Sequence, residues 1–160
     1  MSKSTIYMIV ISILFLVTTF VFGYLYLQER KEEKEWMARS MTNFISHVES
    51  ASATADSILE RKADPQFVHT LNLLRLLYQM ESIMESTPHM YNGNYYIRDM
   101  IRTVQDAISR NGYDEDLIQK LTVIHANLNK WIVLFEQEEQ IDMQTFNDIF
   151  TSVINLTDPE

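Results

Sequence analysis

Four histidines are the residues in this chain best suited to bind a metal ion, and their spacing bears on whether they do. Helical bundles hold di-metal centres with Glu-x-x-His pairs that project inward. The residues three positions before the histidines at 47, 69, 89 and 125 are Phe44, Gln66, Ser86 and Thr122. The sequence also lacks a His-Glu-x-x-His motif. We therefore expect no metal centre and no cofactor.

Other reactive groups are equally sparse in the linear sequence. There is no cysteine, so thiol catalysis and thiolate metal sites are excluded. The only three glycines, at 23, 93 and 112, do not form a phosphate-binding loop. The acidic run of Glu136, Glu138, Glu139 and Asp142 lacks the alternating oxygen ligands and the central glycine of a calcium loop. Because no nucleophile and base stand in a recognisable pattern, we expect a protein that is not an enzyme.

One polar and aromatic segment has the composition of a recognition surface. Exposed aromatic rings beside amides and a cation are common where proteins bind a ligand or a partner. The candidate binding residues are Tyr91, Asn92, Asn94, Tyr95, Tyr96 and Arg98. The alternative is that Tyr95 and Tyr96 begin a helix and pack over the end of a bundle.

The charge of the chain is uneven. The net charge is −9, and residues 114–160 carry two basic and ten acidic groups, whereas residues 65–113 carry four of each. An acidic surface repels phosphate backbones and anionic lipid. We therefore expect no nucleic-acid partner and no peripheral membrane binding through this third of the chain.

Residues 6–27 form an apolar run without a charged residue, and such a run needs an apolar environment. A helix of this length measures about 33 Å, enough to cross a hydrocarbon core of about 30 Å. A cleaved signal peptide is the alternative, but residues 24–27 continue the apolar run past Val21 and Gly23, the only small-residue cleavage point available. The run predicts a permanent transmembrane anchor behind a short tail of residues 1–5.

Two arguments disagree about the side of the membrane on which the rest of the chain lies. Arg30, Lys31, Lys34 and Arg39 follow the run, against Lys3 before it, and the positive-inside rule then favours a cytoplasmic domain. Four glutamates in residues 29–35 cancel this charge. An apolar span near the N-terminus directs export of the chain after it, and the balance favours an extracytoplasmic domain.

Helical periodicity runs through the remaining chain. Apolar residues alternate in steps of four and three in two segments, and such spacing places them on one face of a helix. The first segment contains Met37, Met41, Phe44, Val48, Ala51, Ala55 and Ile58, and the second contains Leu117, Leu121, Ile124, Leu128, Trp131 and Phe135. The first predicts a helix that leaves the membrane and runs to about residue 62. Ala51 and Ala55 would allow a neighbouring helix to approach closely.

Start and stop signals divide the rest of the chain into three further helices. Asp64 and Pro65 predict a start, and the helix to about residue 85 is apolar on two lines, so we expect it to be the most buried element. A third helix is expected over residues 95–110, and Asn111-Gly112 and Asp114 separate it from the fourth. Asp142 predicts the N-cap of a short last helix that docks through Met143, Phe146, Phe150 and Val153.

These elements predict an all-α fold, with an N-terminal transmembrane helix followed by an antiparallel bundle of four longer helices and a short C-terminal helix. The domains would be a tail (1–5), an anchor (6–27), a charged juxtamembrane helical segment (28–36) and the bundle (37–160). The leading hypothesis is a single-pass interaction or sensing module that binds a protein partner or a second copy of itself. The alternatives are a small-molecule sensor with a pocket near Tyr91–Arg98, and a tether or scaffold facing the cytoplasm.

Overall fold

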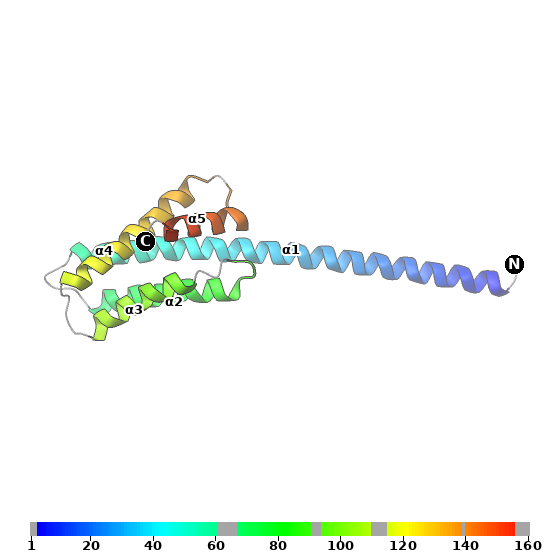
Figure 1. The fold of residues 1–160 in the computed structure, drawn as a ribbon. Coiled ribbons are helices and arrows are strands. Elements are labelled where there is room, and N and C mark those ends of the chain that lie inside the picture. Colours follow the sequence, from blue (N-terminus) through cyan, green and yellow to red (C-terminus); the bar gives the residue numbers. More distant parts are fainter. Residues whose placement is uncertain (1–2, 61–66, 91–93, 110–114, 139, 156–160) are drawn as a thin grey trace. The chain divides into compact units, whose positions relative to one another are not determined.

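The described part of the chain is entirely helical, apart from short connections (Figure 1). The computed structural model describes residues 3–60, 67–90, 94–109, 115–138 and 140–155. Within these ranges there are five helices and no strand. The helices are α1 (Lys3–Glu60), α2 (Phe67–Ser86), α3 (Asn94–Ser109), α4 (Glu115–Glu136) and α5 (Met143–Asn155).

The chain divides into two compact units, Met1–Trp36 and Met37–Glu160. In the described residues, α1 is the one helix long and apolar enough to cross a membrane, and none of its apolar stretch is buried within the protein. The long apolar N-terminal helix that the sequence predicts is therefore present.

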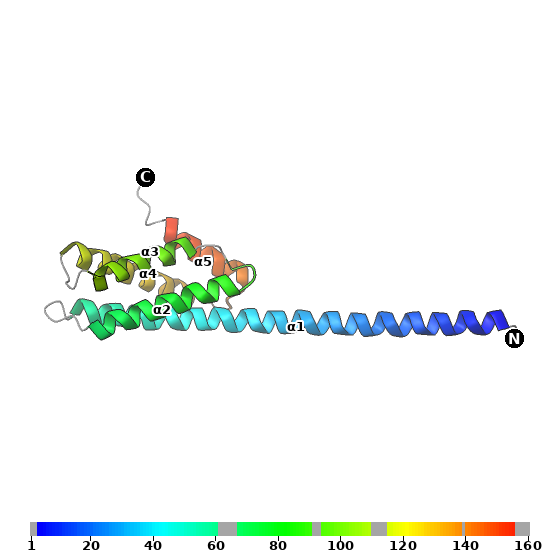
Figure 2. The same ribbon diagram turned by 90° about the horizontal axis from the view of Figure 1, so that it is seen from below.

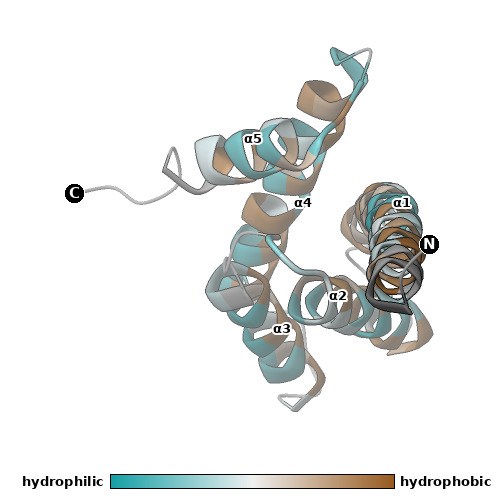
Figure 3. Cartoon of the chain, turned by 90° about the vertical axis from the view of Figure 1, so that its right-hand side faces the viewer, coloured by the Kyte–Doolittle hydropathy of each residue, from teal (hydrophilic) through white to brown (hydrophobic). Residues whose placement is uncertain are grey.

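The second unit is a helical bundle around one apolar core. Within this unit α2 packs against α3, α3 against α4, and α4 against α5 (Figures 1 and 2). The second half of α1 joins them through hydrogen bonds from Ser52 to Asn129 in α4 (2.6 Å) and from Asn72 in α2 to Thr54 (3.3 Å). Coloured by hydropathy, α3 and α4 each carry both hydrophobic and hydrophilic turns (Figure 3). Helices of mixed hydropathy are typical of positions where one face packs on the core and the other faces outward.

The apolar stripe predicted for the first bundle helix is confirmed. Phe44, Val48, Ala51 and Ala55 are fully buried, and Met37 at the start of the stripe is half-buried. The two alanines lie beside the residues that bond to α2 and α4, because Ser52 and Thr54 stand between them in the sequence. Their small side chains leave room for both neighbouring helices at this point of α1.

Aromatic rings fill the middle of this core. Trp131 is fully buried, and its ring stacks on that of Phe150 at 4.6 Å between centroids. The Phe44 ring meets Phe146 edge-on at 5.2 Å and Trp131 at 6.4 Å. Edge-on and offset pairs are the favoured arrangements of aromatic side chains. Since these rings come from α1, α4 and α5, the cluster joins three elements that are far apart in the sequence.

The prediction that the second helix is the most buried element is wrong for one of its two apolar lines. Leu73, Leu77, Met80 and Met84 are buried, as expected. In the other line, 55% of the surface of Phe67, 42% of Leu71 and 44% of Tyr78 is accessible, while Leu74 is half-buried against the core. An apolar face needs a neighbouring element to cover it, and the described residues cover the second line only in part, at Leu74.

Asp142 caps α5 as predicted. The backbone N–H of Thr145 donates a hydrogen bond to the Asp142 carboxylate at 2.8 Å, and the N–H of Phe146 donates to the Asp142 carbonyl at 2.9 Å. The hydrogen bond from the Thr145 backbone is the main reason why the pKa of Asp142 is lowered, with smaller contributions from the Thr145 side chain and the Gln144 backbone. Below the cap, Phe146, Phe150 and Val153 are buried and Met143 is half-buried against the core, which confirms how this helix docks.

The cap predicts a pH-dependent contribution to stability. A carboxyl whose folded pKa is depressed stabilises the folded state above its unfolded pKa and loses this effect as the pH falls through the folded value. Asp142→Ala should therefore lower the midpoint of thermal unfolding at neutral pH, and the difference from the wild type should shrink below pH 3.8, the ordinary carboxyl pKa. Circular dichroism of the two proteins across this range measures the difference.

Asparagine provides the control for this experiment, because its side chain accepts the same hydrogen bond and caps helices about as well as aspartate. Asp142→Asn should stay near the wild type at neutral pH. A constant difference between wild type and Asp142→Ala at every pH would contradict the assignment.

Several predicted signals lie outside the described residues: the start at Asp64 and Pro65, the stop at Asn111-Gly112, and Asp114. The helices on either side of these positions begin and end within a few residues of the predicted boundaries.

Candidate functional site

A groove between α3 and α4 is the best candidate for a functional site in the bundle. It has a volume of about 570 Å³, within the range of about 300–1,000 Å³ that is usual for ligand pockets. We name it the α3–α4 groove. Its lining residues are Tyr95, Tyr96, Asp99, Met100, Thr103, Asp116, Gln119, Lys120, Val123, Ile124 and Asn127.

Helical spacing brings these residues together. Tyr95, Asp99 and Thr103 stand four residues apart, so they follow one another along a single face of α3. On α4 the lining residues fall beside the core stripe, and Ile124 belongs to both. Met100 and Ile124 are only 4% and 5% exposed. The groove therefore has an apolar floor continuous with the core.

One end of the groove is held in place by a polar contact. The Asn127 amide, which is 3% exposed, donates a hydrogen bond to the hydroxyl of Tyr96. The Tyr96 ring also meets Trp131 edge-on at 5.9 Å between centroids. A buried amide needs such a partner, since an unpaired one costs stability. Tyr96 thus contributes chiefly to the packing of α3 against α4.

The rim at the same end is open. The Tyr95 side chain is 76% exposed and that of Val123 is 50% exposed. Asp99 is also exposed and has no hydrogen-bond or ion-pair partner among the described residues. Tyr95 and Asp99 are one helical turn apart, so a bound group can meet the aromatic ring and the carboxylate together.

The opposite end carries a satisfied pair of charges. The Lys120 ammonium lies 2.8 Å from the Asp116 carboxylate, one turn away on α4, and both side chains are more than half exposed. Exposed pairs of this kind contribute little to stability. The pair neutralises one acid of the groove and leaves the charge of Asp99 without a counterion among the described residues.

Arg98, one of the predicted binding residues, lies outside the groove lining. Its Nε donates to Glu81 and its Nη2 to Glu85, both at 2.5 Å, so the guanidinium joins α3 to α2. The hydrogen bond from Arg98 to Glu81, together with the charges of the two glutamates, raises the pKa of Arg98. The guanidinium of Arg98 is already paired with two carboxylates, and these bonds hold α2 and α3 together.

The predicted recognition cluster is thus divided by the fold. Tyr95 and Tyr96 line the groove, and Arg98 points toward α2. Asn94 begins α3, and only its backbone is described. Tyr91 and Asn92 lie outside the described residues.

Sequence reasoning missed the acidic and α4 members of the groove. Asp99, Val123 and Asn127 were not among the predicted site residues. A signal for α4 was present, because Val123 is a β-branched apolar residue that stands outside the core stripe. For Asp99 the signal was its position one turn after Tyr95.

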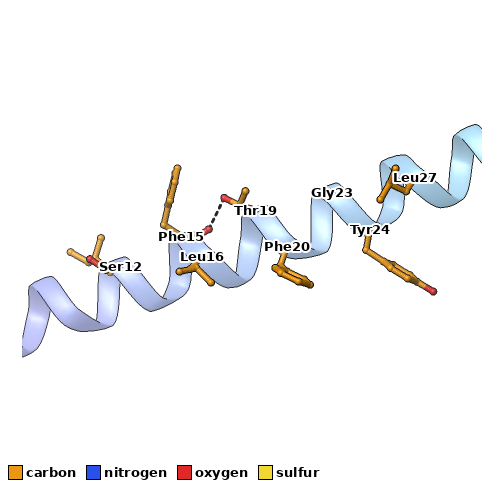
Figure 4. Close-up of a pocket in the computed structure, with 9 residues that line it drawn as sticks. Ser12, Phe15, Leu16, Thr19, Phe20, Gly23, Tyr24 and Leu27 are labelled. Carbon is orange, nitrogen blue, oxygen red and sulfur yellow. Dashed lines mark hydrogen bonds between the residues drawn. The ribbon is translucent and has the colours of Figure 1, made fainter.

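A second hollow lies along the apolar part of α1 (Figure 4). All nine residues that line it belong to this one helix, so it is an open face of a helix and not a cavity between elements. Ser12, Thr19 and Gly23 make the face narrow, and an added Cβ at Gly23 would meet nothing within 4 Å. The Thr19 hydroxyl donates to the Phe15 carbonyl at 2.9 Å.

A polar cluster between α1 and α4 combines a serine, a histidine and an aspartate. The Ser52 hydroxyl donates to Asn129 at 2.6 Å, and the Asn129 amide lies 3.0 Å from Nε2 of His125. The same nitrogen is 3.9 Å from the Asp56 carboxylate. Because Ser52 bonds to the amide and not to the imidazole, this cluster does not have the nucleophile–base hydrogen bond of a catalytic triad. The described residues contain no group of His, Asp and Glu arranged to hold a metal ion.

Neither a protein-family model, nor a curated protein, nor a solved structure matches this chain.

Proposed function

We propose that this protein is a non-enzymatic, single-pass membrane protein whose antiparallel helical bundle binds a protein partner through the α3–α4 groove. The observation that carries the proposal is the groove itself. An apolar floor formed by Met100 and Ile124 lies beside exposed Tyr95 and Val123, and rims of this composition are common in protein recognition.

The apolar part of α1 supports the attachment to a membrane. An exposed apolar surface of this length is unfavourable in water and favourable in a hydrocarbon core. The charged residues after it include Arg30, whose guanidinium lies over the ring of Tyr26 at 5.4 Å from its centroid. Tyrosine and arginine at the end of a span are typical of the membrane–water interface. For the bundle we favour the extracytoplasmic side.

Site-specific photo-crosslinking in cell membranes tests the proposal. Two variants are made, one with a photoreactive amino acid at Val123 and one with it at Tyr95. Both should form an adduct with the same partner protein. In a separate sample the membranes are washed with alkaline carbonate, and the protein should remain in the pellet as an integral membrane protein does.

Thr122 provides a matched control for Val123. It is the adjacent residue, is also exposed and β-branched, and does not line the groove. The photoreactive group at Thr122 should give little of this adduct. Equal adducts from positions 122 and 123, or release of the protein by carbonate, would contradict the proposal.

A small-molecule sensor is the second candidate, and the volume of the groove favours it. At about 570 Å³ the groove could accommodate a metabolite-sized ligand. In that case position 123 should give no protein adduct, and a small ligand should raise the midpoint of thermal unfolding of the wild type, because a ligand that binds the native state stabilises it.

A further inference from the structure

We infer that the partner segment which occupies the α3–α4 groove is basic and amphipathic, with a lysine or arginine that meets Tyr95 and Asp99 and an apolar side chain that meets the floor. This inference rests on the proposed function and specifies the chemistry of the partner. It is carried by the arrangement of charge and apolar surface in the groove.

The charge of the groove is the first step. Three of its lining residues are charged: Asp99, Asp116 and Lys120. Lys120 is engaged by Asp116 at 2.8 Å, so the carboxylate of Asp99 has no counterion among the described residues. A ligand cation placed there gains a charge pair without displacing an existing one.

The aromatic rim is the second step. Tyr95 lies one helical turn before Asp99 on the same face of α3, and its ring is 76% exposed. The face of a tyrosine ring attracts an ammonium or guanidinium group. A cation that approaches Asp99 therefore has an aromatic surface beside it, a combination that favours lysine and arginine over neutral polar side chains.

The floor is the third step. Met100 and Ile124 are almost completely buried, and Val123 is half exposed next to them. This surface is suited to an apolar side chain. Since cation and apolar contacts lie on one groove, a segment with basic and apolar residues about one helical turn apart fits it, as in other cases where a helix binds in a groove.

The charge of the chain supports the same choice. The net charge is −9, and residues 114–160, which include α4, carry ten acidic against two basic groups. A field of this sign accelerates the approach of a basic segment and repels an acidic one. The acidic segment should therefore increase the selectivity for basic partners beyond the selectivity that Asp99 provides by itself.

Binding of synthetic peptides to the full chain in phosphatidylcholine nanodiscs tests the inference. The probes are a Leu/Lys peptide with helical spacing, its Leu/Glu counterpart, and a Leu/Lys peptide of the same composition whose order removes the helical spacing. Binding to empty nanodiscs is subtracted. We expect the spaced Leu/Lys peptide to bind about tenfold more tightly than the other two.

Substitutions on the rim connect this binding to the groove. Asp99→Asn should weaken the Leu/Lys peptide about two- to fivefold and reduce the dependence of its affinity on salt. Tyr95→Ala should weaken it by a similar factor. Asp148→Asn removes the same charge from a position on α5 that does not line the groove, and it should leave the affinity nearly unchanged.

Three results would overturn the inference even if the Leu/Lys peptide binds. They are equal affinity for the Leu/Glu peptide, an equal effect of Asp99→Asn and Asp148→Asn, and competition by N-acetyl-lysine amide at the same affinity as the peptide, which would indicate a site for a small organic cation. If the Leu/Lys peptide does not bind although Val123 still crosslinks to a protein, the partner is not basic and the proposed function stands. If the crosslink is absent as well, both fail.

Discussion

Replacement of Trp131 by alanine should lower the free energy of unfolding by about 3–5 kcal/mol, the usual cost of removing a large buried aromatic side chain. The Trp131 ring is fully buried and contacts Phe44, Tyr96 and Phe150. Its loss would leave a cavity where α1, α3, α4 and α5 meet. Chemical denaturation of the full chain in detergent, followed by circular dichroism at a helical wavelength, measures the change.

The second tryptophan of the chain is the control. Trp36 is 39% exposed and lies outside the bundle core, so Trp36→Ala should change the stability of the bundle much less. Similar losses from both substitutions would show that Trp131 does not occupy the centre of the core. Because Tyr96 packs against Trp131, the substitution should also weaken binding in the α3–α4 groove.

Enlargement of Ala51 or Ala55 to leucine is the second change with a large expected effect. Both alanines are fully buried, and Ser52 and Thr54, which stand between them, bond to α4 and α2. Extra methylene groups in a well-packed core force neighbouring helices apart or side chains out of their preferred rotamers, at a cost of about 1–3 kcal/mol. The same denaturation experiment measures the loss.

Ala53 gives a matched control on the same helix. It lies between the two alanines but is exposed. Ala53→Leu adds the same atoms and should be nearly neutral, since leucine and alanine both favour helices. If Ala55→Leu were as stable as Ala53→Leu, the inference that neighbouring helices pack closely against α1 at this point would be wrong.

The sequence predicted the helices well because the evidence for a helix is local. A stripe such as Phe44, Val48, Ala51 and Ala55 depends only on the 3.6-residue repeat, and all four residues are buried as expected. The cap at Asp142 is local as well, since the bond that defines it reaches only to Thr145. Both features can be read from a few consecutive residues.

The exposed line of α2 shows where such reasoning fails. Leu71 and Tyr78 have the same spacing as core residues, and periodicity shows that a face is apolar without showing what covers it. Cover depends on elements distant in the sequence. In the described residues they bury the face that contains Leu73 and Leu77, and they leave Leu71 and Tyr78 exposed.

The candidate site was predicted in part for the same reason. The composition of residues 91–98 indicated a recognition surface, and Tyr95 and Tyr96 do line a groove. The sequence could not show that Arg98, three residues after Tyr95, turns to Glu81 and Glu85 on another helix. Nor could it show that α4 supplies the other wall, because α3 and α4 meet through contacts such as Tyr96–Asn127, between residues far apart in the chain.

The sequence by itself thus determined the helical class, the long apolar N-terminal helix and the stripes that face the core, because each depends on the order of neighbouring residues. Only the tertiary structure decided which helices adjoin and which charges remain unpaired among the described residues. Those outcomes depend on the packing of side chains from separate helices. The α3–α4 groove belongs to this second group, since its floor and its rim exist only where the two helices meet.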